Sequence, residues 1–406
     1  MADILFVILV VLVTAYILSE IFKHFGLPRV LGQILAGIFL GIPLFKDYLF
    51  DAGILSVFAF LTNIGIILLF FFVGLEINIR DFQRNVKESA LISIFNTILP
   101  LFLGFIVSRA LFNFDNLTSL IIGIALAVSS QAISLDILEE AKLLKSKIGN
   151  LIMTSGTVDD VFELIAISTV LVIFEAALAG HASIYSLLFN ILIFTAIILV
   201  LRVTLIPFAL RTFEKDKSHA VLFMGALIIV LFMAYLSQIF GVSSLIGALV
   251  AGMMVRHTLV TSDRKPWEKN NISHSIYVIS FGFLIPIFFV NVGLQTNIEM
   301  ITSNFWLAFV LLVVDIVGTL AGTIIGVKLS KGTFTEGMIV GWAITPKGDT
   351  ELVIASLALA SGLISVGVYT AIITVAIAST FIAPIVFKLL IRKHPDVVRG
   401  RKTSSG

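Results

Sequence analysis

The chain has 406 residues, of which 59% are hydrophobic and only 13% are charged, and its formal net charge is +2. Soluble globular domains are about half apolar and a quarter charged, so this composition excludes an ordinary soluble protein and indicates one that lies mostly in a lipid bilayer. The sequence has no cysteine, which excludes disulfides, thiolate metal sites and cysteine nucleophiles.

Apolar stretches long enough to cross a bilayer as helices follow one another along the whole chain. A crossing needs about 20 apolar residues, and on this criterion the sequence predicts an all-α polytopic membrane protein with about thirteen transmembrane helices. In chain order the stretches are Ile4–Phe22, Val30–Phe45, Ile54–Leu75, Ala90–Phe112, Leu120–Ile137, Asn150–Leu178, Tyr185–Leu210, Ala220–Phe240, Ser243–Val255, Ile276–Leu294, Phe305–Val327, Thr335–Leu363 and Val366–Ile391.

The basic residues gather in every second loop between these stretches. Because Lys and Arg mark cytoplasmic loops, this pattern predicts an N-terminus outside the cell, a cytoplasmic C-terminus and an odd number of spans. Residues 1–391 then form a single transmembrane unit, and residues 392–406 form a short basic cytoplasmic tail.

Two short segments occur twice in the chain. Leu31–Gly37 matches Ile246–Gly252 at an offset of 215 residues, and Phe71–Gly74 matches Phe288–Gly293 at an offset of about 217–219 residues. The partners lie seven predicted spans apart, so the two halves would have opposite orientations, and inverted repeats are typical of secondary transporters. Chance similarity between short apolar segments is the alternative.

The same offset pairs two polar interruptions of predicted spans. The fifth span contains Ser129, Ser130 and Gln131, and the equivalent place in the twelfth span holds Pro346 and Lys347. Proline removes a backbone donor and clashes with the preceding helical turn. Paired discontinuous helices of this kind indicate a binding site, because their ends offer carbonyl groups and dipoles to an ion. For the two serines alone, hydrogen bonding between helices would be the simpler interpretation.

Three acids lie in the sixth predicted span. Asp159 and Asp160 are adjacent, and Glu163 follows one turn later. An ionised carboxylate at the centre of a bilayer costs about 2.5–3.5 kcal/mol on insertion scales. Neighbouring carboxylates also repel each other, so at least one should bind a proton or a cation. A helix-capping pair at the membrane surface is the alternative, but apolar residues continue on both sides.

Three further charged residues fall inside predicted spans. Asp315 shares a helix face with a stripe of glycines at 318, 322 and 326, which predicts that it points into protein and not into lipid. Lys347 is expected to neutralise the C-terminal end of a half-helix or to pair with an acid. Glu351, at position i+4 from Lys347, is one candidate for that acid.

Other kinds of chemistry have no motif in the sequence. The six histidines show no metal-ligand spacing, and there is no P-loop, dinucleotide-binding motif or nucleophile elbow. We therefore expect no enzymatic activity, no cofactor, and no nucleotide or nucleic acid as partner. A transporter of this kind would be driven by ion gradients.

In these segments the chain resembles the cation:proton antiporter superfamily, in its monovalent cation:proton antiporter-2 branch of Kef/Nap-type sodium–proton exchangers. The resemblance covers about residues 27–390. The matching segments are Gly32–Gly37, Phe71–Glu76, Ser129–Ser130, Asp159–Asp160, Phe288–Phe289 with Gly293, and Lys347–Gly348.

This resemblance implies a homodimer with elevator-like alternating access in a prokaryotic plasma membrane. The dimerisation part would comprise about residues 1–79 and 185–294, and the transport part about residues 90–178 and 305–391. Two discontinuous helices would cross beside the aspartate pair, where Asp160 would be the main site shared by metal cation and proton, and Asp159 the adjacent acid.

Two residues depart from the family pattern. Asp315 stands at or near the position where electrogenic members carry a lysine, which favours electroneutral exchange and makes Asp315 a candidate cation ligand. Glu163 replaces a small or apolar residue.

The sequence thus predicts a monovalent cation/proton antiporter, with Na⁺ as the expected cation. Cation and proton would compete for the buried carboxylates, and Ser129, Ser130 and Gln131 would supply oxygen ligands, which hard cations prefer. The alternatives are a K⁺/H⁺ antiporter or K⁺ efflux protein, a gated cation channel, and an ion-sensing membrane protein.

Overall fold

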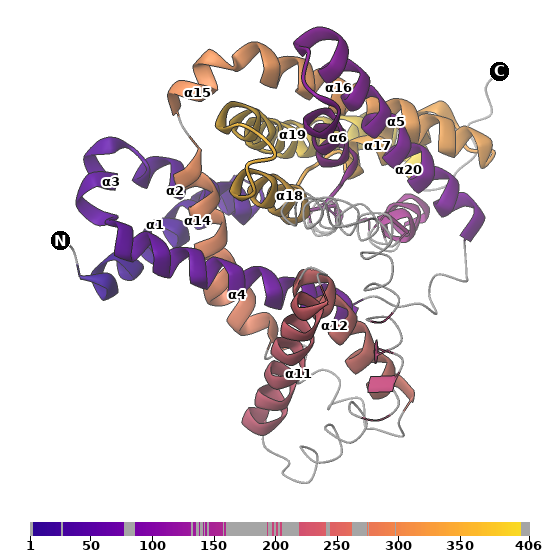
Figure 1. Ribbon diagram of the computed structural model, residues 1–406. Coiled ribbons are helices and arrows are strands. Elements are labelled where there is room, and N and C mark those ends of the chain that lie inside the picture. The colour runs from indigo at the N-terminus through magenta and orange to yellow at the C-terminus, as the bar shows by residue number, and fades with distance from the viewer. Residues whose placement is uncertain are drawn as a thin grey trace. The chain divides into compact units, whose positions relative to one another are not determined.

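All regular secondary structure in the described part of the chain is helical (Figure 1). The computed structural model describes residues 3–25, 27–76, 86–130, 146–156, 219–240, 244–261, 276–296 and 298–398, and some isolated positions that include Val158 and Asp159. Of the predicted stretches, Asn150–Leu178 and Tyr185–Leu210 lie mostly outside these residues.

Six helical stretches of the described residues are long and apolar enough to cross a membrane, or seven if α2 (Arg29–Leu40) and α3 (Pro43–Leu49) form one bent span. The number of spans in the whole chain stays a prediction. The six are α1 (Ile4–His24), α4 (Ala52–Glu76), α5 (Val86–Phe112), residues 276–295 with the π-helical turn η2 (Ser280–Leu284) and α14 (Ile285–Gln295), α16 (Phe305–Leu329) and α19 (Val366–Lys393).

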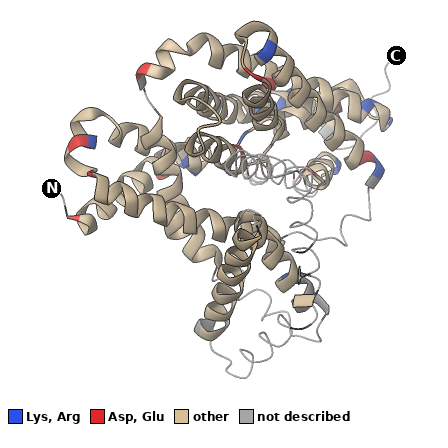
Figure 2. Cartoon of the chain, viewed as in Figure 1, with Lys and Arg blue, Asp and Glu red and all other residues tan. Residues whose placement is uncertain are grey.

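Other helices complete the described structure. They are α6 (Asn116–Ala127), α11 (His219–Ile239), α12 (Ser244–Thr261), α15 (Ile298–Ser303), α17 (Phe334–Ile344), α18 (Asp349–Ala360) and α20 (Pro395–Val398). Figure 2 shows long uncharged helical stretches, with most of the charged residues near helix ends. This is the distribution that the cost of charge in a hydrocarbon layer requires.

The residues group into two compact units. The first comprises residues 1–12, 43–78 and 168–291, and the second comprises residues 13–42, 79–167 and 292–406. The second unit contains both predicted helix interruptions. The predicted division into a dimerisation part and a transport part stays a prediction.

In the first unit, α4 packs on α12 through glycines. A Cβ atom added to Gly74 would lie 2.3 Å from the carbonyl oxygen of Leu249, and one added to Gly252 would lie 2.2 Å from that of Phe71. The two backbones therefore touch, and no larger residue fits at either position without a shift. Arg256 of α12 also donates a hydrogen bond to the carbonyl oxygen of Leu75, near the C-terminal end of α4.

The second unit contains the matching contact. A Cβ atom at Gly293 would lie 2.1 Å from the carbonyl oxygen of Ile34 and 2.7 Å from the Cα atom of Gly37. Gly37 and Gly252 are equivalent in the sequence repeat, and so are Gly74 and Gly293. The first repeated segment of each half thus packs on the second repeated segment of the other half, as a two-fold relation between the halves requires. This reciprocity favours a true repeat over chance similarity.

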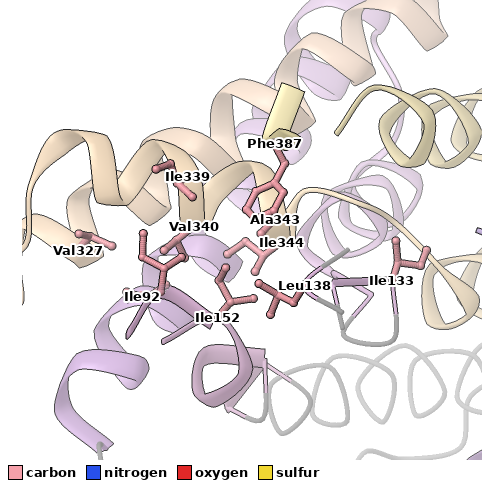
Figure 3. Close-up of a cluster of buried hydrophobic side chains, with 11 residues drawn as sticks. Ile92, Ile133, Leu138, Ile152, Val327, Ile339, Val340, Ala343, Ile344 and Phe387 are labelled. Carbon is pink, nitrogen blue, oxygen red and sulfur yellow. The ribbon is translucent and has the colours of Figure 1, made fainter. Parts of the chain in front are cut away.

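The predicted glycine stripe of α16 is confirmed as a packing surface. Added Cβ atoms at Gly318, Gly322 and Gly326 would each lie within 3 Å of backbone atoms of α5. Beside this contact lies an apolar cluster that joins α5, α16, α17 and α19 (Figure 3), and it includes Ile92, Val327, Ile339, Val340 and Phe387. Close packing of α5 on α16 is what places Asp315 inside the protein, at 0% exposure.

Helix ends in the second unit are capped by side chains. The carboxylate of Asp115 accepts hydrogen bonds from the backbone N–H groups of Leu117 and Thr118 at the start of α6. A bond from the Thr118 hydroxyl is the main cause that holds the pKa of Asp115 below its usual value. At the start of α17, Thr333 and Glu336 form a capping box. These caps fix where α6 and α17 begin.

Candidate functional site

Two interrupted helical segments meet inside the second unit. Helix α6 ends at Ala127, and Val128 is already extended, with φ −79° and ψ 136°. Helix α17 ends at Ile344, and α18 begins at Asp349. The backbone N–H of Ser130 donates to the carbonyl oxygen of Pro346 at 2.9 Å, so the two breaks are in direct contact. The repeat offset had predicted both interruptions.

The contact between the breaks requires a glycine. A Cβ atom at Gly348 would lie 2.4 Å from the hydroxyl oxygen of Ser130. Pro346, two residues earlier, has no N–H to continue the helical ladder. Ser134 ties the segments together a second time, since its hydroxyl donates to the carbonyl oxygen of Ala343 at 2.8 Å. The interruption is thus held by hydrogen bonds.

Lys347 lies at the centre of the break and is only 2% exposed. Its ammonium group donates to the carbonyl oxygen of Leu126 at 2.6 Å, in the last turn of α6. This bond places a positive charge at the negative end of a half-helix, one of the two roles predicted for this lysine. The hydroxyl of Thr380 on α19 donates to the carbonyl oxygen of Lys347 at 2.7 Å, which fixes the backbone.

The acid paired with Lys347 is Asp315. The ammonium nitrogen lies 3.0 Å from Asp315 Oδ1, and both side chains are buried. The suggested Lys347–Glu351 pair does not occur in the described structure, where both carboxyl oxygens of Glu351 have no hydrogen-bond partner. Spacing within one helix favoured Glu351, but tertiary packing brings α16 closer to the ammonium group.

Asp159 is 3% exposed and is surrounded by uncharged donors. The hydroxyl of Ser93 donates to Oδ1 at 2.5 Å, and the amide of Asn96 donates to Oδ2 at 3.2 Å. Longer bonds come from the hydroxyls of Ser129 at 3.4 Å and Thr97 at 3.5 Å. One predicted site residue, Ser129, is therefore brought to Asp159 directly from the break in α6.

The residues of α5 around Asp159 were missed by sequence reasoning. Ser93 and Asn96, which donate to Asp159, share one helix face with Ser89, whose hydroxyl donates to Thr154. The three are buried and follow one another at spacings of four and three. That spacing within an apolar helix was the available signal. The Oδ1 atom of Asn96 is buried without a hydrogen-bond donor and adds an oxygen close to the carboxylate.

Three predicted site residues, Asp160, Gln131 and Glu163, lie outside the described residues. Among the described site residues, the charged groups near Asp159 can be identified. Lys347 is already engaged by Asp315, and the hydrogen-bond donors to Asp159 carry no charge. An ionised Asp159 therefore has no direct counter-charge among them. A buried carboxylate in this condition is neutralised by a proton or a bound cation.

A helical membrane protein in which two interrupted helices meet near a buried acid has the architecture of an ion-coupled secondary transporter. The family model described as "Sodium/hydrogen exchanger, transmembrane" matches residues 8–393, and the chain belongs to this family. The finer placement in the antiporter-2 branch stays a prediction.

Several relatives are similar over almost their full length. The chain is 28% identical to a Na(+)/H(+) antiporter of Enterococcus hirae, with 95% of this chain and 98% of that protein covered. It is 25% identical to the Na(+)/H(+)-K(+) antiporter GerN of Bacillus cereus, with 94% and 95% covered. The fold matches the solved sodium proton antiporter MjNhaP1 of Methanocaldococcus jannaschii, with a TM-score of 0.67, 14% identity and 99% of each chain covered.

Proposed function

We propose that this chain exchanges Na⁺ for H⁺ across a membrane, and that both ions compete for the carboxylates of Asp159 and Asp160. The observation that carries the proposal is the environment of Asp159, a buried acid whose described partners are uncharged donors. Membership of the sodium/hydrogen exchanger family supports it.

In the proposed mechanism each conformational state holds one ion or the other. A protonated carboxyl offers a cation no negative charge, and a bound cation occupies the oxygens that a proton would need. Ser129, Ser130 and Gln131 would add oxygen ligands from the break after α6, and Glu163 would add a third acid. Asp315 is left out of this ligand set because its Oδ1 atom is engaged by Lys347.

The role of Lys347 in this mechanism is to stabilise the break. Its ammonium group bonds the end of α6 at Leu126 and the carboxylate of Asp315, so it stays with the interrupted helices instead of pairing with Asp159. Movement of an ion to or from Asp159 can then occur without breaking the ion pair. This separation supports an exchange of one cation for one proton.

We extend the proposal to the assembly and its setting. The chain would act as a homodimer in a prokaryotic plasma membrane, with its C-terminus in the cytoplasm, and would move the ion site by an elevator-like displacement. A K⁺/H⁺ exchanger is the second candidate, because the similar protein GerN is described as a Na(+)/H(+)-K(+) antiporter.

The test is proton flux in proteoliposomes driven by Na⁺ or K⁺ gradients. We expect Asp160→Asn and Asp159→Asn to abolish cation-driven proton movement, while both variants elute from a sizing column like the wild type. Glu88→Gln, at an exposed position of α5, is the matched control and should retain the flux. Full activity of Asp160→Asn would refute the mechanism, and a larger response to K⁺ than to Na⁺ would favour the second candidate.

A further inference from the structure

Glu351 is a buried acid that the proposed exchange does not use. It lies in the first turn of α18, is 0% exposed, and neither of its carboxyl oxygens has a hydrogen-bond partner in the described structure. Lys347, one turn earlier, donates to Leu126 and Asp315 instead. An ionised carboxylate left in this condition is among the most costly groups a protein can bury.

Few charges of the described residues act on Glu351. The charged groups among them that interact with it are Lys347 and Asp315. Helix α18 packs on α6 and α19, and α6 has no titratable residue within its bounds. On α19, the hydroxyl of Tyr369 donates to the carbonyl oxygen of Val292. The basic residues of α19 lie at least two turns beyond Thr380, the residue that bonds the backbone of Lys347. The described cluster therefore contains one positive charge and two acids.

The helix dipole does not remove this imbalance. Glu351 is the third residue of α18, where the positive end of the helix favours a carboxylate. That effect is smaller than the cost of removing a carboxylate from water without a partner. One of the two acids must therefore be neutral, and the ion pair with Lys347 shows that Asp315 is the ionised one.

A proton fits this site better than a metal cation. Hard metal ions are coordinated by about six or more oxygens. The buried oxygens without a partner here are the two of Glu351 and Asp315 Oδ2, and Lys347 stands close to them with its own positive charge. A proton needs a single carboxyl oxygen.

We propose that Glu351 is a second proton-binding site of this chain, separate from Asp159 and Asp160, and that it keeps its proton while Asp315 holds Lys347. The bound proton makes the three-residue cluster neutral overall. Because the two acids compete for one lysine, removing the charge of Asp315 would give Lys347 to Glu351, and Glu351 would then release its proton.

Infrared spectroscopy of the reconstituted full-length protein tests this without relying on transport. An ordinary glutamic acid is ionised at about pH 8 and shows no carboxylic acid carbonyl band. In Na⁺ buffer, where the proposed exchange site holds the cation, we expect the wild type to retain such a band at this pH, and Glu351→Gln to lose it. The exposed control Glu88→Gln should keep it. Asp315→Asn should also lose it, although Glu351 is still present.

The outcomes separate this proposal from the proposed exchange. If the wild type shows no band, or if Glu351→Gln retains it in full, Glu351 does not hold the proton. If Asp315→Asn keeps the band, competition for Lys347 is not the cause and the proposal fails. A band that appears only when Na⁺ is removed and that Glu351→Gln abolishes would assign a cation to Glu351 and overturn the proposal as well, whereas a Na⁺-dependent band that Asp159→Asn or Asp160→Asn abolishes belongs to the proposed exchange site. The band that Glu351 contributes in Na⁺ buffer therefore tests this proposal separately from the exchange.

Discussion

At the scale of single residues, the pair formed by Lys347 and Asp315 has large consequences for stability. Both side chains are buried, and their charged atoms are 3.0 Å apart. Removing one partner of such a pair leaves an uncompensated charge in the interior, at a cost of about 3–5 kcal/mol. Replacing both partners with apolar residues avoids that cost. The contribution of the pair must therefore be read from a double-mutant cycle.

We predict that Lys347→Met lowers the free energy of unfolding by about 3–5 kcal/mol, because Asp315 is left unpaired. Adding Asp315→Leu should recover most of this loss. The measurement is denaturant unfolding of the four proteins in the same detergent. Losses that simply add in the double variant would contradict a direct pair, and a stable single variant would show that Asp315 has another partner or takes up a proton when Lys347 is removed.

The partner of Lys347 also shows where sequence reasoning stops. Its place at a helix break, and its role at a half-helix end, followed from Pro346 and the repeat offset. Asp315 is 32 residues earlier on another helix, and no rule of local spacing relates the two. The i+4 rule suggested Glu351 because it describes only one helix. Ser93 and Asn96 were missed for a related reason, since polar residues in membrane helices serve many contacts.

At the scale of helices, the glycine contacts explain why short segments recur in the two halves. Gly37 meets Gly293 in one unit and Gly74 meets Gly252 in the other, with backbone atoms in van der Waals range. The repeat was visible in the sequence because close backbone approach tolerates few residue types. What the sequence left open was which segments touch, because that depends on how the halves fold onto each other.

We predict that Gly293→Ala and Gly252→Ala each destabilise the protein by about 1–3 kcal/mol, because the added methyl group overlaps a carbonyl oxygen of the facing helix. Gly282→Ala is the matched control, since a Cβ atom there would have nothing within 4 Å. Thermal unfolding in detergent measures the effect. Alanine has the higher helix propensity, so Gly282→Ala should be neutral or slightly stabilising. If it is as harmful as the other two, overlap with the facing helix would not account for the losses.

At the scale of the whole molecule, the electrical balance of transport depends on which groups change charge during a cycle. Apolar stretch length, loop charge and the repeat indicated a polytopic secondary transporter, and the family match agrees with that class. The number of protons exchanged per cation could not be inferred in the same way, because it depends on the contacts of a few buried charges. Lys347 pairs with Asp315, and Asp159 is held by neutral donors, so the proposed exchange site at Asp159 has no paired lysine among the described residues.

We therefore predict electroneutral exchange. A lysine that released a proton whenever a cation bound would add a second proton to each cycle and make transport electrogenic. Here the lysine is held by an acid and by the end of α6, and the prediction is that these contacts persist through the cycle. Proton flux driven by a Na⁺ gradient in proteoliposomes should be the same, within about twofold, with and without a K⁺ ionophore that clamps the voltage. Flux that generates a membrane potential, or that the clamp accelerates severalfold, would mean that Lys347 or another buried group gives up a proton during the cycle. Repeating the measurement with the double variant Asp315→Asn/Glu351→Gln, which leaves Lys347 without either acid, separates these two sources. If Lys347 is the group, loss of both acids should increase the voltage dependence, and if it is not, the voltage dependence should stay as it is in the wild type.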